Sequence, residues 1–399
     1  MKRKILFSAS LFHALNDATT VTVPMIFPLL FSQKFIITRY SDIGILSNLG
    51  LFTTFLFQIV IATYAHRFEY RWMLLLSILG ISVSVFGITF SQTFGAMLAL
   101  YLLLRVFTSF YHPIGIATVS KAHPDQGLDF AMGIQSGSGN LGVFIAFVAA
   151  GYLAQDFGWK MPLYACAGAS LALGILSFMA VRKTPVKRER VIRPDLSSWL
   201  ETLKDIRAYI LGFVFGGACW GTTVYYAPSL FNHKFHVPLG KTGVFLALWI
   251  GLGSVMTYLY GYISRKAGRK RASGISLAGS TLALLFLGGA SGLSLAVASL
   301  LFFGVFLFLI FPALQSAVGE GVSRKNQVLA FSLVANIQMI TGSVVVLVAG
   351  FISDRFGINA PFLMIAFLGI LTSVFYLFRK ASPLSVLPKK HGFRPQSRT

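Results

Sequence analysis

The sequence predicts an all-α membrane protein with twelve transmembrane helices in two pseudo-symmetric six-helix bundles. Of its 399 residues, 55% are hydrophobic and only 12% are charged, a composition too apolar for a soluble globular protein. Its apolar runs are about 20 residues or longer, and a helix of that length crosses a hydrocarbon core of about 30 Å. Landmarks of the first half also recur in the second half at one fixed separation.

Twelve apolar runs are divided by short turns that are rich in glycine, proline or charge. We expect membrane spans at 5–31, 43–64, 72–91, 94–119, 130–154, 159–181, 208–231, 242–263, 272–290, 293–317, 327–352 and 359–379. The first run follows a basic start, as in a signal peptide, but it is long and contains Asp17, so we expect an uncleaved span.

One long polar interruption separates the two sets of six spans. We therefore expect an N-terminal bundle at 1–181, a cytoplasmic linker at 182–207 and a C-terminal bundle at 208–380. The linker is basic and contains a candidate surface helix from Asp195 to Arg207. The remaining segment, 381–399, is rich in basic residues and proline and is expected to be a disordered cytoplasmic tail.

The two halves resemble each other at a constant offset. Gly151–Gly158 (GYLAQDFG) matches Gly350–Gly357 (GFISDRFG), and Pro113 corresponds to Pro312, both at a separation of 199 residues. Such a repeat indicates a duplicated six-span unit. In secondary transporters built this way the ligand site lies between the halves near the middle of the membrane.

The net charge of +22 could indicate nucleic-acid binding, so the positions of the basic residues decide its meaning. With the N-terminus inside, 27 of the 34 lysines and arginines fall on the same side as that terminus. This distribution follows the positive-inside rule and places both termini in the cytoplasm. We therefore expect the lipid bilayer, and no nucleic acid, as the partner of the basic surface.

Asp17 lies near the middle of the first apolar run. A carboxylate at that depth is costly unless it is paired, protonated or facing water, which favours a functional group in an internal cavity. The alternative is a hydrogen bond that packs two helices. His13 lies one turn away on the same face, so these two residues are the candidate proton-coupling pair. No other acidic residue lies at midplane, which favours a proton over sodium as the coupling ion.

Two basic side chains lie in the fourth run. Arg105 is at the depth of Asp17, and we expect it to pair with Asp17 or with an anionic substrate. A purely structural ion pair is the alternative. His112 precedes Pro113, which should distort the helix and free a carbonyl group. His112 and His13 can then share one layer, although a packing role for His112 is equally open.

The second half offers aromatic and amide side chains instead of charge. We therefore expect the first half to carry the charge and the second to supply an apolar wall with hydrogen-bond donors, although aromatic residues in spans also face lipid. The candidate substrate-binding residues of both halves are Asn16, Arg105, His112, Gln135, Asn140, Trp220, Tyr225, Tyr258, Gln315 and Asn336.

Gly261–Lys270 (GYISRKAGRK) resembles the major facilitator signature G-x-x-x-D-R-x-G-R-K, which follows an even-numbered span. Arg265 stands where the family usually has aspartate, and the first-half copy at Ala62–Arg71 departs further, with His66 and Glu69 at the aspartate and glycine positions. The resemblance implies the major facilitator fold and a cytoplasmic gate locked by charge pairs. The candidate gate residues are Arg67, Arg71, Gly261, Arg265, Gly268 and Arg269. The alternative is that they only anchor the topology.

Three short motifs resemble the fosmidomycin-resistance-like exporters of that superfamily. They are His13–Asp17 (HALND), Tyr111–Pro113 (YHP) and Gly137–Gly142 (GSGNLG). This resemblance implies a multi-pass protein of the bacterial inner membrane that exports a small molecule. Antiporters of the superfamily tend to have a proline after the span-five G-x-x-x-G, and Ser138 stands there instead. These glycines also allow close helix packing in any transporter.

Enzymatic functions find no support. Gly240–Thr242 (GKT) is similar to part of a phosphate-binding loop, but Phe235 occupies the required glycine position. The sequence therefore favours proton-coupled efflux of a small amphipathic or anionic molecule by alternating access. Proton-coupled or uniport uptake of an anionic metabolite is the main alternative, and a membrane scaffold or sensor is a third. We expect a monomer with no cofactor other than the coupling proton, and no metal site.

Overall fold

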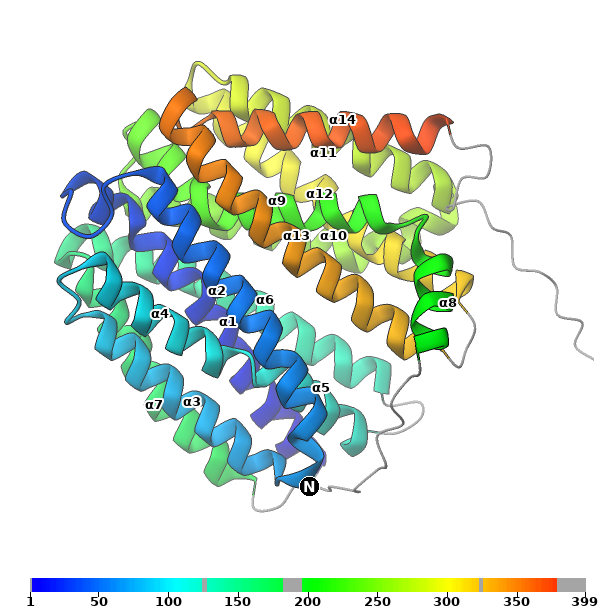
Figure 1. The fold of residues 1–399 in the computed structure, drawn as a ribbon, viewed down its shortest axis with the longest axis horizontal. Coiled ribbons are helices and arrows are strands. Elements are labelled where there is room, and N and C mark those ends of the chain that lie inside the picture. Colours follow the sequence, from blue (N-terminus) through cyan, green and yellow to red (C-terminus); the bar gives the residue numbers. More distant parts are fainter. Residues whose placement is uncertain (1, 124–127, 182–195, 323–325, 379–399) are drawn as a thin grey trace, which may run out of the picture.

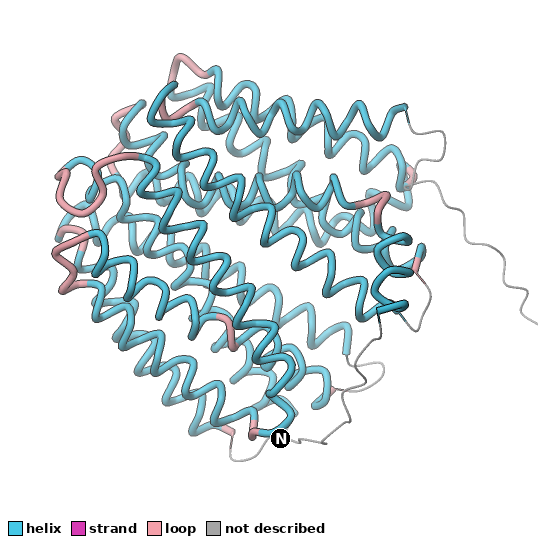
Figure 2. Tube along the Cα trace, in the orientation of Figure 1, coloured by secondary structure: helices cyan, strands magenta, loops and turns pink. Residues whose placement is uncertain are grey.

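The computed structural model describes residues 2–123, 128–181, 196–322 and 326–378. Within these ranges the chain forms helices joined by short turns, with no strand (Figures 1 and 2). The tail that the sequence predicts at 381–399 and most of the predicted linker lie outside the described residues.

The first half of the chain forms seven α-helices, which pack as one bundle. Their bounds are α1 (Lys2–Ser32), α2 (Tyr40–Tyr64), α3 (Tyr70–Ile88), α4 (Phe94–Thr108), α5 (Tyr111–Ala122), α6 (Leu128–Phe157) and α7 (Lys160–Ala180). A short 3-10 turn, η1 (Ala65–Arg67), follows α2. In this bundle α1 packs against α6 and α7, and α3 packs against α4 and α7.

The second half begins with α8 (Leu196–Ile206), where the sequence predicts a surface helix. The second bundle follows, with α9 (Ile210–Ser229), the π-helix η3 (Leu230–Lys234), α10 (Leu239–Ala267), α11 (Arg269–Gly289), α12 (Leu293–Gly321), α13 (Gln327–Phe356) and α14 (Ala360–Phe378). Here α9 packs against α13, and α11 packs against α12 and α14. Helix α8 contacts α12 and α13.

The described residues contain eleven helical segments long and apolar enough to cross a membrane, with α4 and α5 together as one segment, and a twelfth apolar helix at Ala360–Tyr376. The predicted fold class, twelve spans in two bundles, is therefore confirmed. Several helices run past the predicted ends, since α10 begins at Leu239 and α12 ends at Gly321.

The fourth span is broken where Pro113 lies, as the sequence predicts. Helix α4 ends at Thr108 and α5 begins at Tyr111. The amide groups of Ser109 and Phe110 bond three residues back instead of four, which tightens the chain at the break. The corresponding Pro312 lies inside the uninterrupted helix α12. The duplicated unit thus has a break in one copy and a continuous helix in the other.

Two helix pairs hold the bundles together, α2 with α13 and α6 with α10. The second pair packs backbone on backbone, because a Cβ atom on Gly243 would lie 2.1 Å from the carbonyl oxygen of Phe147. Figure 1 shows the two bundles close to each other at the end away from α8 and further apart toward α8. We call these two ends of the molecule the far side and the α8 side.

Hydrogen bonds between the bundles gather on the far side. The carboxylate of Asp354, near the end of α13, accepts hydrogen bonds from the backbone N–H groups of Tyr40 at 2.6 Å and Ser41 at 3.1 Å. These two residues begin α2, where the helix leaves unbonded N–H groups. The side-chain oxygen of Gln155 accepts a bond from the N–H of Gly240 at 3.0 Å, at the start of α10.

These two contacts join equivalent positions in the two halves of the repeat. Gln155 and Asp354 are separated by 199 residues, and so are Ser41 and Gly240. We call them the far-side latches. They differ in charge, since one acceptor is a carboxylate and the other a neutral amide.

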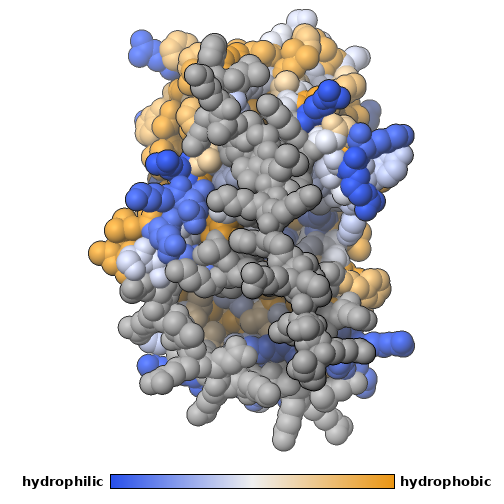
Figure 3. Space-filling model, turned by 90° about the vertical axis from the view of Figure 1, so that its right-hand side faces the viewer, coloured by the Kyte–Doolittle hydropathy of each residue, from blue (hydrophilic) through white to orange (hydrophobic). Residues whose placement is uncertain are grey.

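His233 of η3 adds a third contact across the far side. Its Nε2 lies 3.1 Å from the carbonyl oxygen of Pro28, and its Nδ1 lies 3.0 Å from the hydroxyl oxygen of Tyr40. Its ring also packs on that of Phe31, with 4.9 Å between the ring centroids. The far side of the molecule is therefore closed by backbone, hydrogen-bond and ring contacts. Figure 3 views the opposite end, where hydrophilic side chains gather among hydrophobic ones.

Candidate functional site

A cavity of about 490 Å³ lies between the two bundles. On α2 its wall begins after Asn48, whose amide bonds the hydroxyl of Ser343 on α13 at 3.1 Å. The cavity therefore lies on the α8 side of the contacts that close the far side. Its wall is formed by Asn16, Asp17, Thr20, Leu51, Thr54, Gln58, Arg105, Thr108, His112, Ile116, Asn140, Val143, Gly217, Trp220, Gly221, Val224, Tyr225, Ala335, Gln338, Met339 and Gly342.

The centre of the site is a cluster of two histidines around one carboxylate. Nε2 of His13 lies 3.1 Å from Oδ2 of Asp17, and Nε2 of His112 lies 3.7 Å from Oδ1 of the same carboxylate. His13 and Asp17 are one turn apart on α1, whereas the break in the fourth span brings His112 in from α5. The predicted pair of His13 and Asp17 is therefore present, and His112 lies in the same layer, against the same carboxylate.

Residues outside the cavity fix the His13 ring. Its Nδ1 lies 2.7 Å from the backbone carbonyl oxygen of Gln135, and the ring stacks on Tyr111 with 4.6 Å between centroids. The side-chain amide of Gln135 donates to the hydroxyl of Tyr111 at 2.9 Å, and this hydroxyl donates to the carbonyl of Ala9 at 2.8 Å. The ring is thus held from three helices and presents only its Nε2 edge to Asp17.

The contacts of the His13 ring indicate where its hydrogens are. A carbonyl oxygen only accepts hydrogen bonds, so the 2.7 Å contact with Gln135 favours a hydrogen on Nδ1, whereas the side-chain amide nitrogen of the same residue, 2.9 Å from Nδ1, favours a bare nitrogen there. An ionised carboxylate also only accepts, so the contact with Asp17 requires a hydrogen on Nε2. The hydrogen on Nε2 is therefore an exchangeable proton that lies between the His13 ring and the carboxylate of Asp17.

Asn16 lies beside this pair and is almost fully buried. Its amide nitrogen donates to Oδ1 of Asp17 at 3.0 Å. Its amide oxygen is buried and has no hydrogen-bond partner among the described residues. Such an orphaned oxygen in a cavity wall needs a donor or a cation from elsewhere.

Arg105 lines the same cavity but does not make the predicted ion pair with Asp17. The ion pairs within the described chain join Asp17 only to His13 and His112, and Nε of Arg105 donates instead to the carbonyl of Gly50 at 3.3 Å. The two histidines lie against the two carboxylate oxygens instead, and the other half of the prediction, an anionic substrate, stays a prediction. Arg105 is left as a buried guanidinium on the cavity wall with no carboxylate beside it in the part of the chain that is described.

The second bundle contributes an apolar and aromatic wall. Trp220 lines the cavity and packs on the ring of Trp249 behind it, with 5.4 Å between centroids. Tyr225 also lines the cavity, and its hydroxyl lies 3.3 Å from that of Tyr101 in the first bundle. Asn140 of α6 completes the set of predicted residues on the wall.

Four predicted substrate-binding residues do not line the cavity. Gln135 is buried behind His13. Tyr258 is 67% exposed, and its hydroxyl lies against Gly137 of α6 at the outer edge of the bundle contact. Gln315 is exposed, and Asn336 is half-buried beside lining residues of α13. The sequence shows that these side chains are polar and lie within membrane spans. It does not show which face of each helix points into the cavity, because that depends on how the helices pack.

The cavity also contains polar residues that the sequence analysis did not select. Thr20 follows Asp17 by three residues on α1, and Thr54 and Gln58 are four apart on α2. Residues three or four apart lie on one face of a helix. Polar residues at this spacing within an apolar run could therefore have been used to predict that this face lines the cavity.

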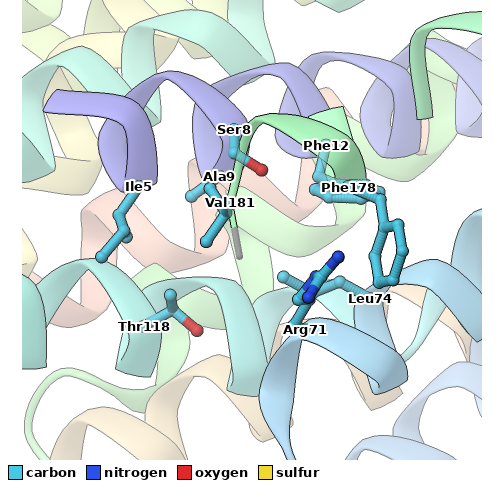
Figure 4. Close-up of a pocket in the computed structure, with 9 residues that line it drawn as sticks. All are labelled: Ile5, Ser8, Ala9, Phe12, Arg71, Leu74, Thr118, Phe178 and Val181. Carbon is cyan, nitrogen blue, oxygen red and sulfur yellow. The ribbon is translucent and has the colours of Figure 1, made fainter. Parts of the chain in front are cut away.

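The predicted gate residues lie on the α8 side. Arg67 is exposed at the end of η1, Arg265 is exposed near the end of α10, and Gly268 makes the turn to α11 with φ +79°. Gly261 faces open space, and Arg269 begins α11. Figure 4 shows Arg71 in a small pocket of the first bundle, where its guanidinium lies 3.8 Å from the ring centroid of Phe178. Arg71 therefore packs on a ring of its own bundle.

A family comparison agrees with this arrangement. The model of the Major Facilitator Superfamily matches residues 6–346 and 268–398. The chain belongs to this superfamily. The resemblance drawn from the gate motif is therefore confirmed, and the family and fold are those of transporters.

Relatives and solved structures extend the comparison. A multidrug resistance protein, MdtG of Serratia proteamaculans (strain 568), is 27% identical over 162 residues. That match spans 39% of this chain and 39% of the relative. A bacterial homolog of the human lysosomal transporter Spinster, in an inward-facing and occupied conformation, has a TM-score of 0.82 at 14% identity, covering 93% of this chain and 95% of that one. The nucleoside transporter NupG has a TM-score of 0.76 at 14% identity, covering 94% and 98%. At these identities the structures show a shared fold alone.

Proposed function

We propose that this chain is a proton-coupled secondary transporter that exports a small amphipathic or anionic molecule by alternating access. The observation that carries the proposal is the His13–Asp17 pair, which holds one exchangeable proton at the wall of a cavity between two duplicated bundles. A proton site and a substrate cavity that share a wall can be coupled, because a change in the distances around Asp17 changes its affinity for the proton.

The far-side latches support alternating access. They close one end of the cavity with three hydrogen bonds, and all three come from backbone N–H groups that water can satisfy when the bundles separate. On this proposal the cavity faces the side that carries α8, and the bundles rock so that the far side opens in turn.

The side assignment is also part of the proposal. Basic residues at the start of α1, at the end of α10 and at the start of α11 all lie on the α8 side, which the positive-inside rule assigns to the cytoplasm. We propose that the protein is a monomer in the bacterial inner membrane with both termini cytoplasmic. The latched far side is then periplasmic.

Export as the direction has its support in the partial likeness to a multidrug resistance protein. Arg105 supports the alternative, uptake of an anionic metabolite, because an unpaired guanidinium on the wall attracts an anion from either side. Deletion of the gene distinguishes them. It raises sensitivity to a toxic substrate if the protein exports, and it abolishes growth on a nutrient if the protein imports.

The decisive experiment measures substrate accumulation in proteoliposomes under an imposed pH gradient, with a substrate found by thermal-shift screening. Asp17→Asn keeps the shape of the side chain but cannot ionise, so it should abolish accumulation driven by the gradient while substrate exchange continues. Asp205→Asn is the matched control, because Asp205 lies on α8 and is not among the residues that line the cavity. If Asp17→Asn still concentrates substrate at the normal rate, Asp17 is a packing residue and the proposal fails.

A further inference from the structure

We infer that His13, Asp17 and His112 form a binding site for a divalent transition-metal ion such as Zn²⁺, Co²⁺ or Ni²⁺. This goes beyond the proposed function and does not depend on it, because binding is measured on the purified protein without transport. The sequence alone indicated no metal site, since His112 is about a hundred residues from the other two ligands and only the break before α5 brings it to them.

The spacing of the three side chains fits one metal ion. The candidate ligand atoms of the three residues all lie within 4.8 Å of one another. A metal bound at about 2.0–2.2 Å to nitrogen and oxygen ligands holds them about 3.3 Å apart in a tetrahedral site. The two histidines face different oxygens of Asp17, His13 at 3.1 Å from Oδ2 and His112 at 3.7 Å from Oδ1, and both distances are close to that value. The His112 side chain is 41% exposed, so its ring has room to move toward the other two ligands when an ion binds.

The outer partners of His13 are those of a metal-binding histidine. In metal sites the ring nitrogen that does not bind the ion usually donates to a carbonyl or carboxylate, which fixes the tautomer and aims the other nitrogen. Here Nδ1 of His13 lies 2.7 Å from the carbonyl oxygen of Gln135 and Tyr111 stacks on the ring, so Nε2 points at Asp17. The ring is thus already oriented for an ion in the cavity.

Asn16 supplies a second, independent observation. Its amide oxygen is buried on the cavity wall and has no hydrogen-bond partner within the described ranges, although its amide nitrogen bonds Asp17. An oxygen left without a donor on a side chain that bonds Asp17 can be satisfied by a cation at the site or by a water bound to that cation. Imidazole and carboxylate together favour Zn²⁺, Ni²⁺ or Co²⁺ over Mg²⁺ and Ca²⁺, which prefer oxygen ligands alone.

Metal binding at this site exchanges one ion for one proton. The hydrogen that Nε2 of His13 donates to Asp17 occupies the lone pair that the metal needs, so it leaves to solvent when the N–metal bond forms. The carboxylate stays ionised and becomes a ligand, and His112 binds through its neutral form. Arg105 is the other charged group on the cavity wall.

The test uses the full chain, purified in detergent without a polyhistidine tag and treated with a chelator, and titrated with ZnCl₂ and with CoCl₂. We expect one Zn²⁺ per chain by calorimetry, release of about one proton per ion in buffers of different ionisation enthalpy, and visible absorption bands of nitrogen-bound Co²⁺. His112→Gln and Asp17→Asn should each weaken binding at least about tenfold, since even loss of an outer-shell partner typically costs that much. Asn16→Ala should cause a smaller loss.

The double variant His123→Ala, His236→Ala is the matched control, because both histidines lie outside the cavity wall and it should keep the Zn²⁺ affinity of the unmodified chain. Size-exclusion profiles and tryptophan fluorescence show which variants fold. His112→Gln is the safest of them, because that side chain is partly exposed and its removal leaves the helix packing in place. The inference is overturned if the unmodified chain shows no saturable binding. It is equally overturned if folded His112→Gln and Asp17→Asn bind Zn²⁺ as tightly as the control.

Discussion

The two bundles arise from one duplicated unit, yet they give the shared cavity different chemistry. The first bundle brings His112, Arg105 and Asp17 to the wall, whereas the lining residues of the second are glycines, aliphatic residues, Gln338 and the rings of Trp220 and Tyr225. Duplication therefore preserved the scaffold while the chemistry of the two copies diverged. The difference indicates that the first bundle handles charge and the second fits the apolar part of the substrate.

Among substitutions that test this difference between the bundles, we expect the largest effect, after loss of Asp17, from replacing Arg105. Arg105→Gln should weaken binding of an anionic substrate about ten- to a hundredfold, because a hydrogen bond to a charged group contributes about 1.5–3 kcal/mol. Arg105→Lys should recover only part of this loss, since a point charge does not replace a planar guanidinium. Equilibrium binding to the purified protein measures both.

Arg207→Gln is the control for Arg105, because Arg207 is exposed just beyond the end of α8. Unchanged affinity in Arg105→Gln would show that the guanidinium serves only the bond to Gly50.

The second bundle is tested by removing its largest ring. Trp220→Ala should weaken substrate binding about two- to tenfold, the range expected for loss of an aromatic contact of about 0.5–1.5 kcal/mol. Proton coupling should persist, because no charged group is altered, so the ratio of uptake with and without a pH gradient is the second measurement. Trp199→Ala on α8 is the control. A loss of coupling at normal affinity would mean that the two walls do not divide their tasks in this way.

The far-side latches compare the bundles at equivalent positions. Asp354→Asn removes the charge at the start of α2 and should shift the population toward an open far side about two- to fivefold, because such a charge contributes about 0.3–1 kcal/mol. Gln155→Glu adds the missing charge to the other latch and should shift the population the opposite way. Distance measurements between spin labels at Phe35 and His236, both in far-side loops, report the shift. Equal and opposite shifts would support the symmetry of the latches, and no shift in either variant would rule them out as determinants of closure.

Much of this arrangement was predictable from the sequence. The length of the apolar runs predicted the spans, and the 199-residue repeat predicted the two bundles. The position of Asp17, His13 and Arg105 within their spans predicted that they belong to the site. The partners of these residues were not predictable. The pairing of Asp17 with His112 instead of Arg105 depends on how α5 turns after its break, and the exposure of Tyr258 depends on which face of α10 meets α6. Helical periodicity was of little help, since spans that face lipid on one side and helices on the other are apolar all round.

The break between α4 and α5 also gives the first bundle a hinge. The N–H groups of Ser109 and Phe110 bond carbonyls three residues back, and Pro113 cannot donate a hydrogen bond, so the break is the place in the fourth span where α5 can tilt most easily against α4. Such a tilt moves His112 toward or away from Asp17 while Arg105 on α4 stays in place. Helix α12 runs past Pro312 without such a break, so we expect the second bundle to turn as a more rigid unit than the first. Amide hydrogen exchange should accordingly be faster at Phe110 and Tyr111 than at Leu309 and Ile310. A rotation of the second bundle against the first would then change the position of His112 by tilting α5 alone.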